Sequence, residues 1–383
     1  MRSIDERREA NQRVRLLCAS AVPSSQVVPD VLQVMHRIVP AEGYVFTWFD
    51  QGGELSGMYC EPPLDRPAPL LMQSPQQLLA EAGYRNDHLR SHSMSGHVAE
   101  ISASPEFKRS VFYEQMCRPA GVDHGWDGFI RVNGHVRAVL ALWRGRQAPP
   151  LTQEEGGRLM AVFPHLSHLL ALEVGAAPTH NRLLACDEQG LALVDLQGRI
   201  VFACAQARRL LWFLAHPAFR SEGAFGGVSA DSVDAIGSVA QRLVSVLRGQ
   251  PAAAPGLEIC NHWGAFSIRG YILDAAQSHV QPLFGLQLTR MLPQEVVAVR
   301  RMAHLPLSIK QKELCLHLVR GSKPAQIEVA LGIKPTTQKD YLLRIYEKLN
   351  IGTREELFDR LLKWVPVLTM DRDPAVKALT SGG

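Results

Sequence analysis

The sequence predicts an α+β protein in which two mixed α/β units are followed by an all-α unit of four helices. The first observation is that β-branched and aromatic runs alternate with helical patterns up to residue 292. The second is that the following stretch shows helical patterns alone, and the third is a length of 383 residues, which suits two or three domains. The expected units are residues 1–175, residues 182–292 and residues 300–365, followed by a loose tail at 366–383.

The composition is that of an ordinary globular protein, with 46% hydrophobic residues and a mean hydropathy of -0.04. No apolar run is long enough to cross a membrane, and the charged start MRSIDERREANQRVRLL lacks the apolar block of a signal peptide. The seven cysteines are scattered and form no Cys-x-x-Cys pair. These features predict a cytoplasmic protein without a membrane span.

The first unit is expected to contain a β-hairpin at 127–145, because Asn133-Gly134 is a dipeptide that tight hairpin turns favour. A long amphipathic helix is expected from Thr152 to Val174, with a kink at Pro164. The other expected elements are helices at 5–19, 26–38 and 104–119 and a strand at 44–50.

The second unit is expected to begin with two strands in 190–204, which turn at Asp195–Gly198. Residues 175–180, GAAPTH, are expected to link it to the first unit. The remaining elements are expected to be helices at 205–214 and 231–248 and strands at 257–262, 263–273 and 282–292.

The positive charge of the chain is concentrated in its last helical unit. Residues 305–365 hold eleven Lys or Arg and seven Asp or Glu, which equals the whole formal net charge of +4. A local positive excess is typical of a nucleic-acid contact, although a solvated helical face produces the same count.

The helical unit carries consistent start and stop signals. Ser308 and Gln311 match a capping box that opens a first helix, and Gly332 permits a sharp turn between the second and third helices. The four helices are expected to begin at Ser308, Pro324, Pro335 and Thr353. Two helices joined by a tight turn, with the second available to a DNA groove, form a helix-turn-helix.

The third helix is expected to have an inner and an outer side. Its inner stripe is Leu342, Ile345 and Leu349, which places Thr336, Lys339, Asp340 and Leu343 on the exposed side. The fourth helix, with Leu357, Leu361, Leu362 and Trp364, is a candidate surface for pairing with a second copy.

The order of residues in this unit resembles the LuxR-type (GerE-type) helix-turn-helix family. The resemblance rests on Leu307-Ser308-Ile309-Lys310-Gln311, Gly321, Gln326-Ile327, Leu331, Thr337-Gln338-Lys339, Ile345 and Lys348-Leu349-Asn350-Ile351-Gly352-Thr353-Arg354. The chain departs from the family where Gln311 replaces Glu, Glu328 replaces Ala, Gln338 replaces Val and Tyr341 replaces His. Two of these changes place polar groups at positions that the family packs with apolar ones.

The resemblance implies that the third helix contacts double-stranded DNA. Asp340 could accept a hydrogen bond from a cytosine amino group, and Leu343 could touch a thymine methyl, so an atypical operator is expected. The expected DNA contacts are Lys334, Thr336, Thr337, Lys339, Asp340, Leu343, Arg344 and Lys348.

The upstream units resemble sensor domains. Residues 26–174 resemble the GAF-like segment found ahead of LuxR-type modules, through Phe112-Tyr113, Arg118-Pro119, Gly121, Leu142-Trp143-Arg144 and 151–166. Residues 186–292 look like a PAS-type fold, through 190–195, 198–201 and the three strands that follow. Such folds bind small molecules or mediate pairing, and the fold alone does not decide between these roles.

Aromatic residues of the first unit are candidate ligand contacts, with ordinary core packing as the alternative for each. The candidates are Tyr44, Phe46, Trp48, Trp126 and Trp143. An acyl-homoserine-lactone ligand is not supported, because the Trp-xxx-Tyr pair and the following Asp-Pro of autoinducer-type relatives are missing.

Neither a metal centre nor an enzyme is expected. Three histidines at 88, 92 and 97, together with His124 and Asp127, are a weak metal candidate, and surface histidines are the simpler interpretation. His165 and His168 are expected to pack or face solvent. The sequence contains no G-x-S-x-G, H-E-x-x-H, G-x-x-x-x-G-K-[ST] or G-x-G-x-x-G motif, and no cofactor is expected.

The sequence therefore predicts a dimeric transcription regulator whose sensing and dimerisation domains control a C-terminal helix-turn-helix. The expected partners are double-stranded DNA, a second copy of the chain and an unknown small-molecule ligand, with RNA polymerase as a further candidate. The alternative is a DNA-binding regulator whose upstream domains bind a protein partner in place of a small molecule.

Overall fold

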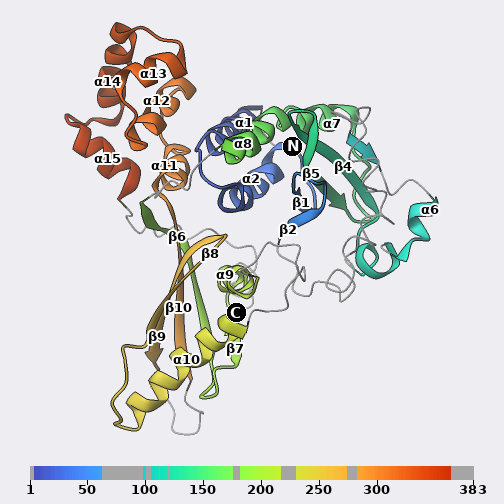
Figure 1. The fold of residues 1–383 in the computed structure, drawn as a ribbon, viewed down its shortest axis with the longest axis vertical. Coiled ribbons are helices and arrows are strands. Elements are labelled where there is room, and N and C mark those ends of the chain that lie inside the picture. The colour runs from blue at the N-terminus through green and yellow to red at the C-terminus, as the bar shows by residue number, and fades with distance from the viewer. Residues whose placement is uncertain are drawn as a thin grey trace, which may run out of the picture.

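The computed structural model describes residues 4–62, 98–100, 105–111, 113–119, 121–175, 182–216, 230–273 and 283–363. The protein is a mixed α+β structure with two five-stranded antiparallel sheets and a C-terminal group of helices (Figure 1). Several features named above lie outside these residues, namely the histidines at 88, 92 and 97, the start of the 104–119 helix, Phe112, most of the 175–180 linker, Trp364 and the 366–383 tail.

The first sheet has the strand order β2-β1-β5-β4-β3, and every neighbouring pair is antiparallel. The expected hairpin is confirmed, because Asn133 and Gly134 adopt positive φ of 52° and 83° between its strands. Two strands, β2 and β3, were not expected from the sequence. The bounds are β1 Gly43–Phe49, β2 Leu55–Glu61, β3 Val98–Glu100, β4 His124–Val132 and β5 His135–Arg144.

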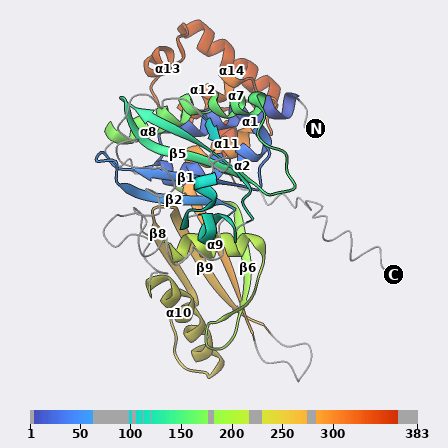
Figure 2. The same cartoon turned by 90° about the vertical axis from the view of Figure 1, so that its right-hand side faces the viewer.

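Helices α1 (Ile4–Cys18), α2 (Ser24–Ile38) and α8 (Phe163–Gly175) pack together over this sheet (Figure 2). The first two confirm the expected helices. The long helix expected from Thr152 to Val174 is two helices, because α7 (Gln153–Met160) ends before Pro164. Proline has no N–H to donate, and at the start of α8 none is needed.

The helix expected at 104–119 was wrong as a single element. The described residues form one short helix, α6 (Pro105–Lys108), and a separate π-helical turn, η2 (Tyr113–Cys117). The sequence pattern gives no signal for this wider turn, in which the N–H of Arg118 reaches back five residues to the carbonyl of Tyr113 at 2.8 Å.

The second sheet has the order β7-β6-β10-β9-β8 and is also fully antiparallel. Helices α9 and α10 cover one of its faces (Figure 1). All five strands and both helices agree with the sequence prediction, apart from a longer β6. The bounds are β6 Leu183–Val194, β7 Ile200–Ala203, α9 Ala205–Ala215, α10 Ala230–Leu247, β8 Gly256–Asn261, β9 Gly264–Ile272 and β10 Phe284–Pro293.

Gly190 of β6 is the point where α9 approaches the second sheet most closely. A Cβ atom placed on Gly190 would lie 2.4 Å from the backbone of Ala207. Only glycine leaves room for this approach. The close packing brings Arg209, two residues further along α9, against the buried side chain of Glu188 on the same strand.

A helix that the sequence did not predict, α11 (Gln294–Met302), follows β10 directly. Beyond it lie α12 (Ile309–Val319), α13 (Pro324–Leu331), α14 (Pro335–Leu349) and α15 (Arg354–Leu362), which confirm the four helices expected in this part of the chain. One cluster of buried apolar side chains runs through both sheets with their helices and through the C-terminal helices. None of the helices that the structure describes is long and apolar enough to cross a membrane.

Candidate nucleic-acid interface

Local capping fixes the positions of α12, α13 and α14. The hydroxyl of Ser308 accepts a hydrogen bond from the N–H of Gln311, whose side-chain oxygen accepts from the N–H of Ser308 at 2.9 Å. Gly332 ends α13 in the left-handed region, with φ of 62°, and α14 begins three residues later at Pro335. This turn sets α14 across α13.

The inner side of α14 packs on α12 and α13. Ile345 and Leu349 are buried as expected, and Leu342 is half-buried. Gln338 is also buried, with 7% of its surface exposed, so the polar group expected at this apolar position does lie on the inner side. Glu328 of α13 and Tyr341 are half-buried.

The outer side of α14 is open to solvent. Leu343 is 59% exposed although it is apolar, and Val329 of the preceding helix is 85% exposed. Among the expected DNA contacts only Thr337 is half-buried. The others are exposed, namely Lys334, Thr336, Lys339, Asp340, Leu343, Arg344 and Lys348. The structure thus brings the predicted residues together on one helix with its outer side uncovered.

Lys348 differs from the other basic residues of α14 because it has a partner within the unit. Its ammonium group donates to the side-chain oxygen of Gln311 at 3.0 Å. The same oxygen completes the Ser308 capping box. A neutral amide in this position joins the start of α12 to the end of α14 without a buried ion pair.

The helical unit is attached to the first unit through α12. Arg15 of α1 forms an ion pair with Glu313, and the guanidinium of Arg320 donates to the backbone carbonyls of Ala19 and Ser20. Lys312 is 5% exposed on the same helix, and burial lowers its pKa, an effect that the charge of Glu9 opposes. These contacts hold α12 against α1 and leave α14 outside the contact.

The apolar side of α15, a candidate pairing surface in the sequence, is used within the chain. Leu357 and Leu361 are fully buried and α15 packs on α11. Arg301 of α11 also donates to the carbonyl of Lys363, at 2.6 Å, just after α15. A helix missed in the sequence therefore covers the leucines that we expected a second copy to cover.

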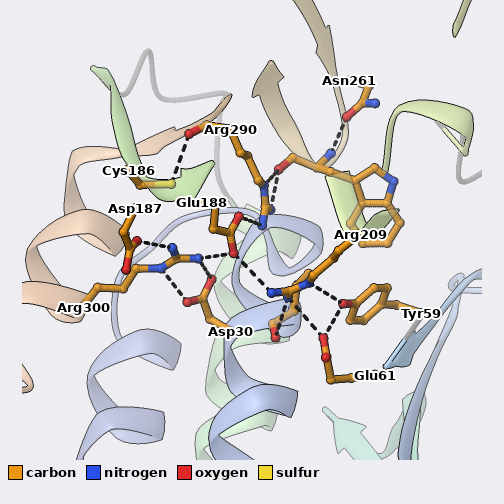
Figure 3. Close-up of polar contacts among 12 residues, drawn as sticks. Asp30, Tyr59, Glu61, Cys186, Asp187, Glu188, Arg209, Asn261, Arg290 and Arg300 are labelled. Carbon is orange, nitrogen blue, oxygen red and sulfur yellow. Dashed lines mark hydrogen bonds and ion pairs between the residues drawn. The ribbon is translucent and has the colours of Figure 1, made fainter. Parts of the chain in front are cut away.

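A network of buried charges joins α11 to both sheets (Figure 3). Arg300 of α11 contacts Asp30 of α2 at 2.7 and 2.8 Å and Glu188 of β6 at 2.8 Å. Glu188 also contacts Arg209 of α9 at 3.3 Å and Arg290 of β10 at 3.1 Å. Helices α9 and α11 and strand β10 thus each bring an arginine to a single carboxylate on β6.

The network continues to the edge of the first sheet. Arg209 lies 3.2 Å from the carboxylate of Glu61, which accepts a hydrogen bond from Tyr59 at 2.5 Å. Burial raises the pKa of Glu61, and the charge of Arg209 opposes this shift. Burial alone would also raise the pKa of Glu188, but three arginines hold it well below its ordinary value. Glu188 is therefore ionised throughout the neutral range.

Four of the five aromatic candidates of the first unit belong to its core. Tyr44, Phe46, Trp48 and Trp126 are buried, and Trp143 is half-buried. The indole N–H of Trp48 donates to the hydroxyl of Ser24 at 2.8 Å, and Tyr44 donates to the carbonyl of Val39. They line neither the cleft between α1 and α7 nor the cleft beside His262. A ligand-binding role for them stays a prediction.

Within the described residues, no group of three or more His, Cys, Asp or Glu is placed to hold a metal ion. His124 stacks on Trp126 with ring centres 5.9 Å apart. Asp127 is buried, and burial raises its pKa from 3.8 to about 8. All seven cysteines are free.

No protein-family model matches the chain, and no curated protein matches it. Solved structures with weak likeness include VqmA of Vibrio cholerae in complex with ligand and DNA (15% identity, 46% of this chain and 86% of that chain, TM-score 0.18). They also include a VqmA dimer of Vibrio cholerae without target DNA, described as a LuxR-type receptor (15% identity, 45% of this chain and 80% of that chain, TM-score 0.17). A third is the sensor region of a sensor histidine kinase (15% identity, 70% of this chain and 93% of that chain, TM-score 0.19). These TM-scores are too low to establish a common fold.

Proposed function

We propose that the chain is a sequence-specific DNA-binding transcription regulator. In this proposal residues 300–365 form a LuxR-type helix-turn-helix domain, and α14 is its recognition helix. The observation that carries the proposal is the uncovered outer side of α14, where Lys339, Arg344 and Lys334 stand beside Thr336 and Leu343. A helix that packs on one side and presents basic, hydroxyl and methyl groups on the other has the chemistry that a major groove requires.

The roles of these side chains follow from their positions. Lys334 precedes the helix and Arg344 lies on its exposed flank, so both are assigned to phosphates. Thr336, Lys339, Asp340 and Leu343 are assigned to base edges, with Thr337 supporting them. Lys348 is assigned to a phosphate, although its bond to Gln311 must then be shared or exchanged.

The upstream units are proposed to act as a GAF-like domain (1–175) and a PAS-like domain (182–292) that control this helix-turn-helix. Their signal would be transmitted through α11, because Arg300 contacts both units, through Asp30 of the first and Asp187 and Glu188 of the second. A signal acts in this way only if it binds two arrangements of the units unequally.

A homodimer is proposed because paired recognition helices read two half-sites. Since α11 covers α15, we assign pairing to the outer face of the second sheet, opposite α9 and α10. Leu191 and Phe202 are each 64% exposed there, and Tyr271 is 47% exposed. Strand pairing places all three on the same face, through Leu193 opposite Phe202 and Gly285 opposite Tyr271. Exposed apolar side chains gathered on one sheet face are typical of an interface.

The experiment that tests the proposal is selection of bound fragments from a pool of genomic DNA, followed by sequencing. A regulator of this kind enriches fragments that share a motif with two related halves. Enrichment without a shared motif, or retention of no duplex at low salt, would contradict it.

The alternative is that the upstream domains bind a protein partner in place of a small molecule, and the burial of the candidate ligand contacts Tyr44, Phe46 and Trp48 in the core favours it. RNA polymerase is one candidate partner. Native mass spectrometry of the purified chain distinguishes the two, because a co-purified or titratable small ligand supports sensing and its absence supports the protein partner.

A further inference from the structure

A cleft with a volume of about 660 Å³ lies between α1, the α7–α8 pair and the start of α12. Its lining is formed by Arg7, Arg8, Asn11, Gln12, Arg15, Glu154, Arg158, His165 and Ile309. This volume is within the range of small-molecule sites. None of these residues belongs to α14 or to the buried charge network, so the cleft is separate from the interface described above.

The cleft is strongly positive. Four of its side chains are guanidinium groups, and Glu154 is its only carboxylate among the lining residues. Arg158 lies 3.5 Å from Glu154, and Arg15 is paired with Glu313 at the edge of the cleft. Arg7 and Arg8 have no ion pair within the described part of the chain. Two of the four positive charges are therefore available to a ligand.

The basic groups come from two sides. Arg8 and Arg15 lie seven residues apart, two helical turns, which places them on one side of α1. Arg158 and His165 belong to α7 and α8 across the cleft. His165 is half-buried, and burial lowers its pKa, with the charge of Arg15 acting in the same direction. A ligand between α1 and α7 would thus meet cationic donors on both sides.

We propose that this cleft binds a small phosphorylated anion. A guanidinium group binds a phosphate through two parallel N–H···O bonds, which makes arginine the residue suited to this chemistry. Asn11 and Gln12 add neutral amide donors, and Ile309 supplies an apolar contact for the uncharged part of the ligand. An open recess bordered by four helices suits a compact ligand better than the convex backbone of a duplex.

The position of the cleft connects it to the helical unit. Ile309 is the first residue of α12, and Arg15 forms the ion pair that holds α12 to α1. An anion that attracts Arg15 competes with Glu313 for the same guanidinium. This consequence for α12 rests on the proposed function, whereas binding of the anion itself does not.

The test is isothermal titration of the full chain with inorganic pyrophosphate at low ionic strength. The double variant Arg7→Gln/Arg8→Gln is expected to weaken binding by about tenfold or more, since it removes both guanidinium groups that have no ion pair within the described residues. Arg158→Gln is expected to weaken it from the other side of the cleft. Arg248→Gln, an exposed arginine after α10, is the matched control and should leave binding within about twofold.

Three results would overturn the proposal. The first is no heat of binding with pyrophosphate, and the second is equal binding by the parent and the double variant. The third is that the parent does not bind pyrophosphate, while the double variant binds a duplex of unrelated sequence more weakly than the parent does. That result would assign Arg7 and Arg8 to contacts with flanking DNA. A titration with citrate tests which type of anion the cleft prefers. Citrate that binds as tightly as pyrophosphate does would contradict the preference for phosphate. All variants change side chains at the surface, and an unchanged melting temperature verifies that they fold.

Discussion

Arg300 of α11 and Asp30 of α2 form a two-point ion pair although they are 270 residues apart in the chain. The Nε–Oδ1 and Nη2–Oδ2 distances are 2.7 and 2.8 Å. The Asp30 side chain is fully buried and that of Arg300 is 9% exposed. Parallel bonds of this kind fix orientation as well as distance. The pair therefore sets the angle at which α11 lies on the first unit.

The first prediction concerns the centre of the same network. Glu188→Gln should lower the free energy of unfolding by about 3–5 kcal/mol, because three arginines lose their shared buried carboxylate. Asp187→Asn is the control, since Asp187 contacts the same Arg300 at 2.9 Å but its side chain is 75% exposed. The control should cost less than about 1 kcal/mol. Urea denaturation measures the free energy of unfolding of both variants. Equal losses would contradict the central role of Glu188 in the network.

The second prediction concerns the pH dependence of stability. Burial raises the pKa of Asp127 from 3.8 to about 8. Below the pKa of the unfolded state, the carboxyl group is protonated in both states and the folded protein has its full stability. As the pH rises toward 8, the unfolded state loses this proton first, so the free energy of unfolding falls. Between about pH 5 and pH 8, the parent should therefore lose at least about 1 kcal/mol relative to Asp127→Asn.

Denaturation curves at several pH values check this difference. Asp5→Asn, at the exposed start of α1, should follow the parent at every pH. A constant gap between the parent and Asp127→Asn across the range would mean that Asp127 does not change its ionisation.

The third prediction concerns α14. Lys339→Ala should weaken operator binding by about 1–3 kcal/mol if Lys339 reads a base. Arg344→Ala should weaken binding to all duplexes and lower the slope of log affinity against log salt by about 1, because one phosphate contact is lost. Gel retardation at several salt concentrations measures both, with Arg248→Ala, at an exposed arginine after α10, as the control. Unchanged retardation by both α14 variants would remove α14 from the DNA contact.

The fourth prediction concerns self-association. Phe202→Asp should convert a dimer into a monomer of 42.3 kDa, since a carboxylate cannot be buried cheaply against an apolar sheet face. Leu247→Asp is matched to it, because Leu247 is also exposed, at 48%, but lies on α10. Size-exclusion chromatography with light scattering gives the mass of each. A dimer that survives Phe202→Asp would place the pairing surface elsewhere.

The C-terminal helices could be predicted from the sequence because their signals are local. Each begins at a cap or a proline and α13 and α14 end at residues in the left-handed region, Gly332 and Asn350. The outer side of α14 followed from helical geometry alone. Thr353 caps α15, in agreement with the helix start expected there, and the side chain of Glu356 accepts from the N–H of Gly352.

Helix α11 was not predicted because its apolar residues are not confined to one side of the helix. Val296, Val297, Ala298 and Val299 are consecutive and all buried, so the apolar residues show no helical period. The charge network could not be predicted either. Asp30, Glu188 and Arg300 are ordinary charged residues in sequence, and only the packing of three segments makes them partners. The apolar side of α15 was assigned to pairing with a second copy because α11, the helix that covers it, was not predicted.

The last strand of the second sheet and the helix that packs on α12 and α15 share a boundary with no residue between them, since β10 ends at Pro293 and α11 begins at Gln294. A junction of this kind has no slack, because the ring of proline also fixes its own φ. Any twist that a bound molecule imposes on β10 must reorient the helix axis by a comparable amount. The second sheet and α11 are thus coupled in orientation, and a change in one would need no long-range unfolding to reach the other.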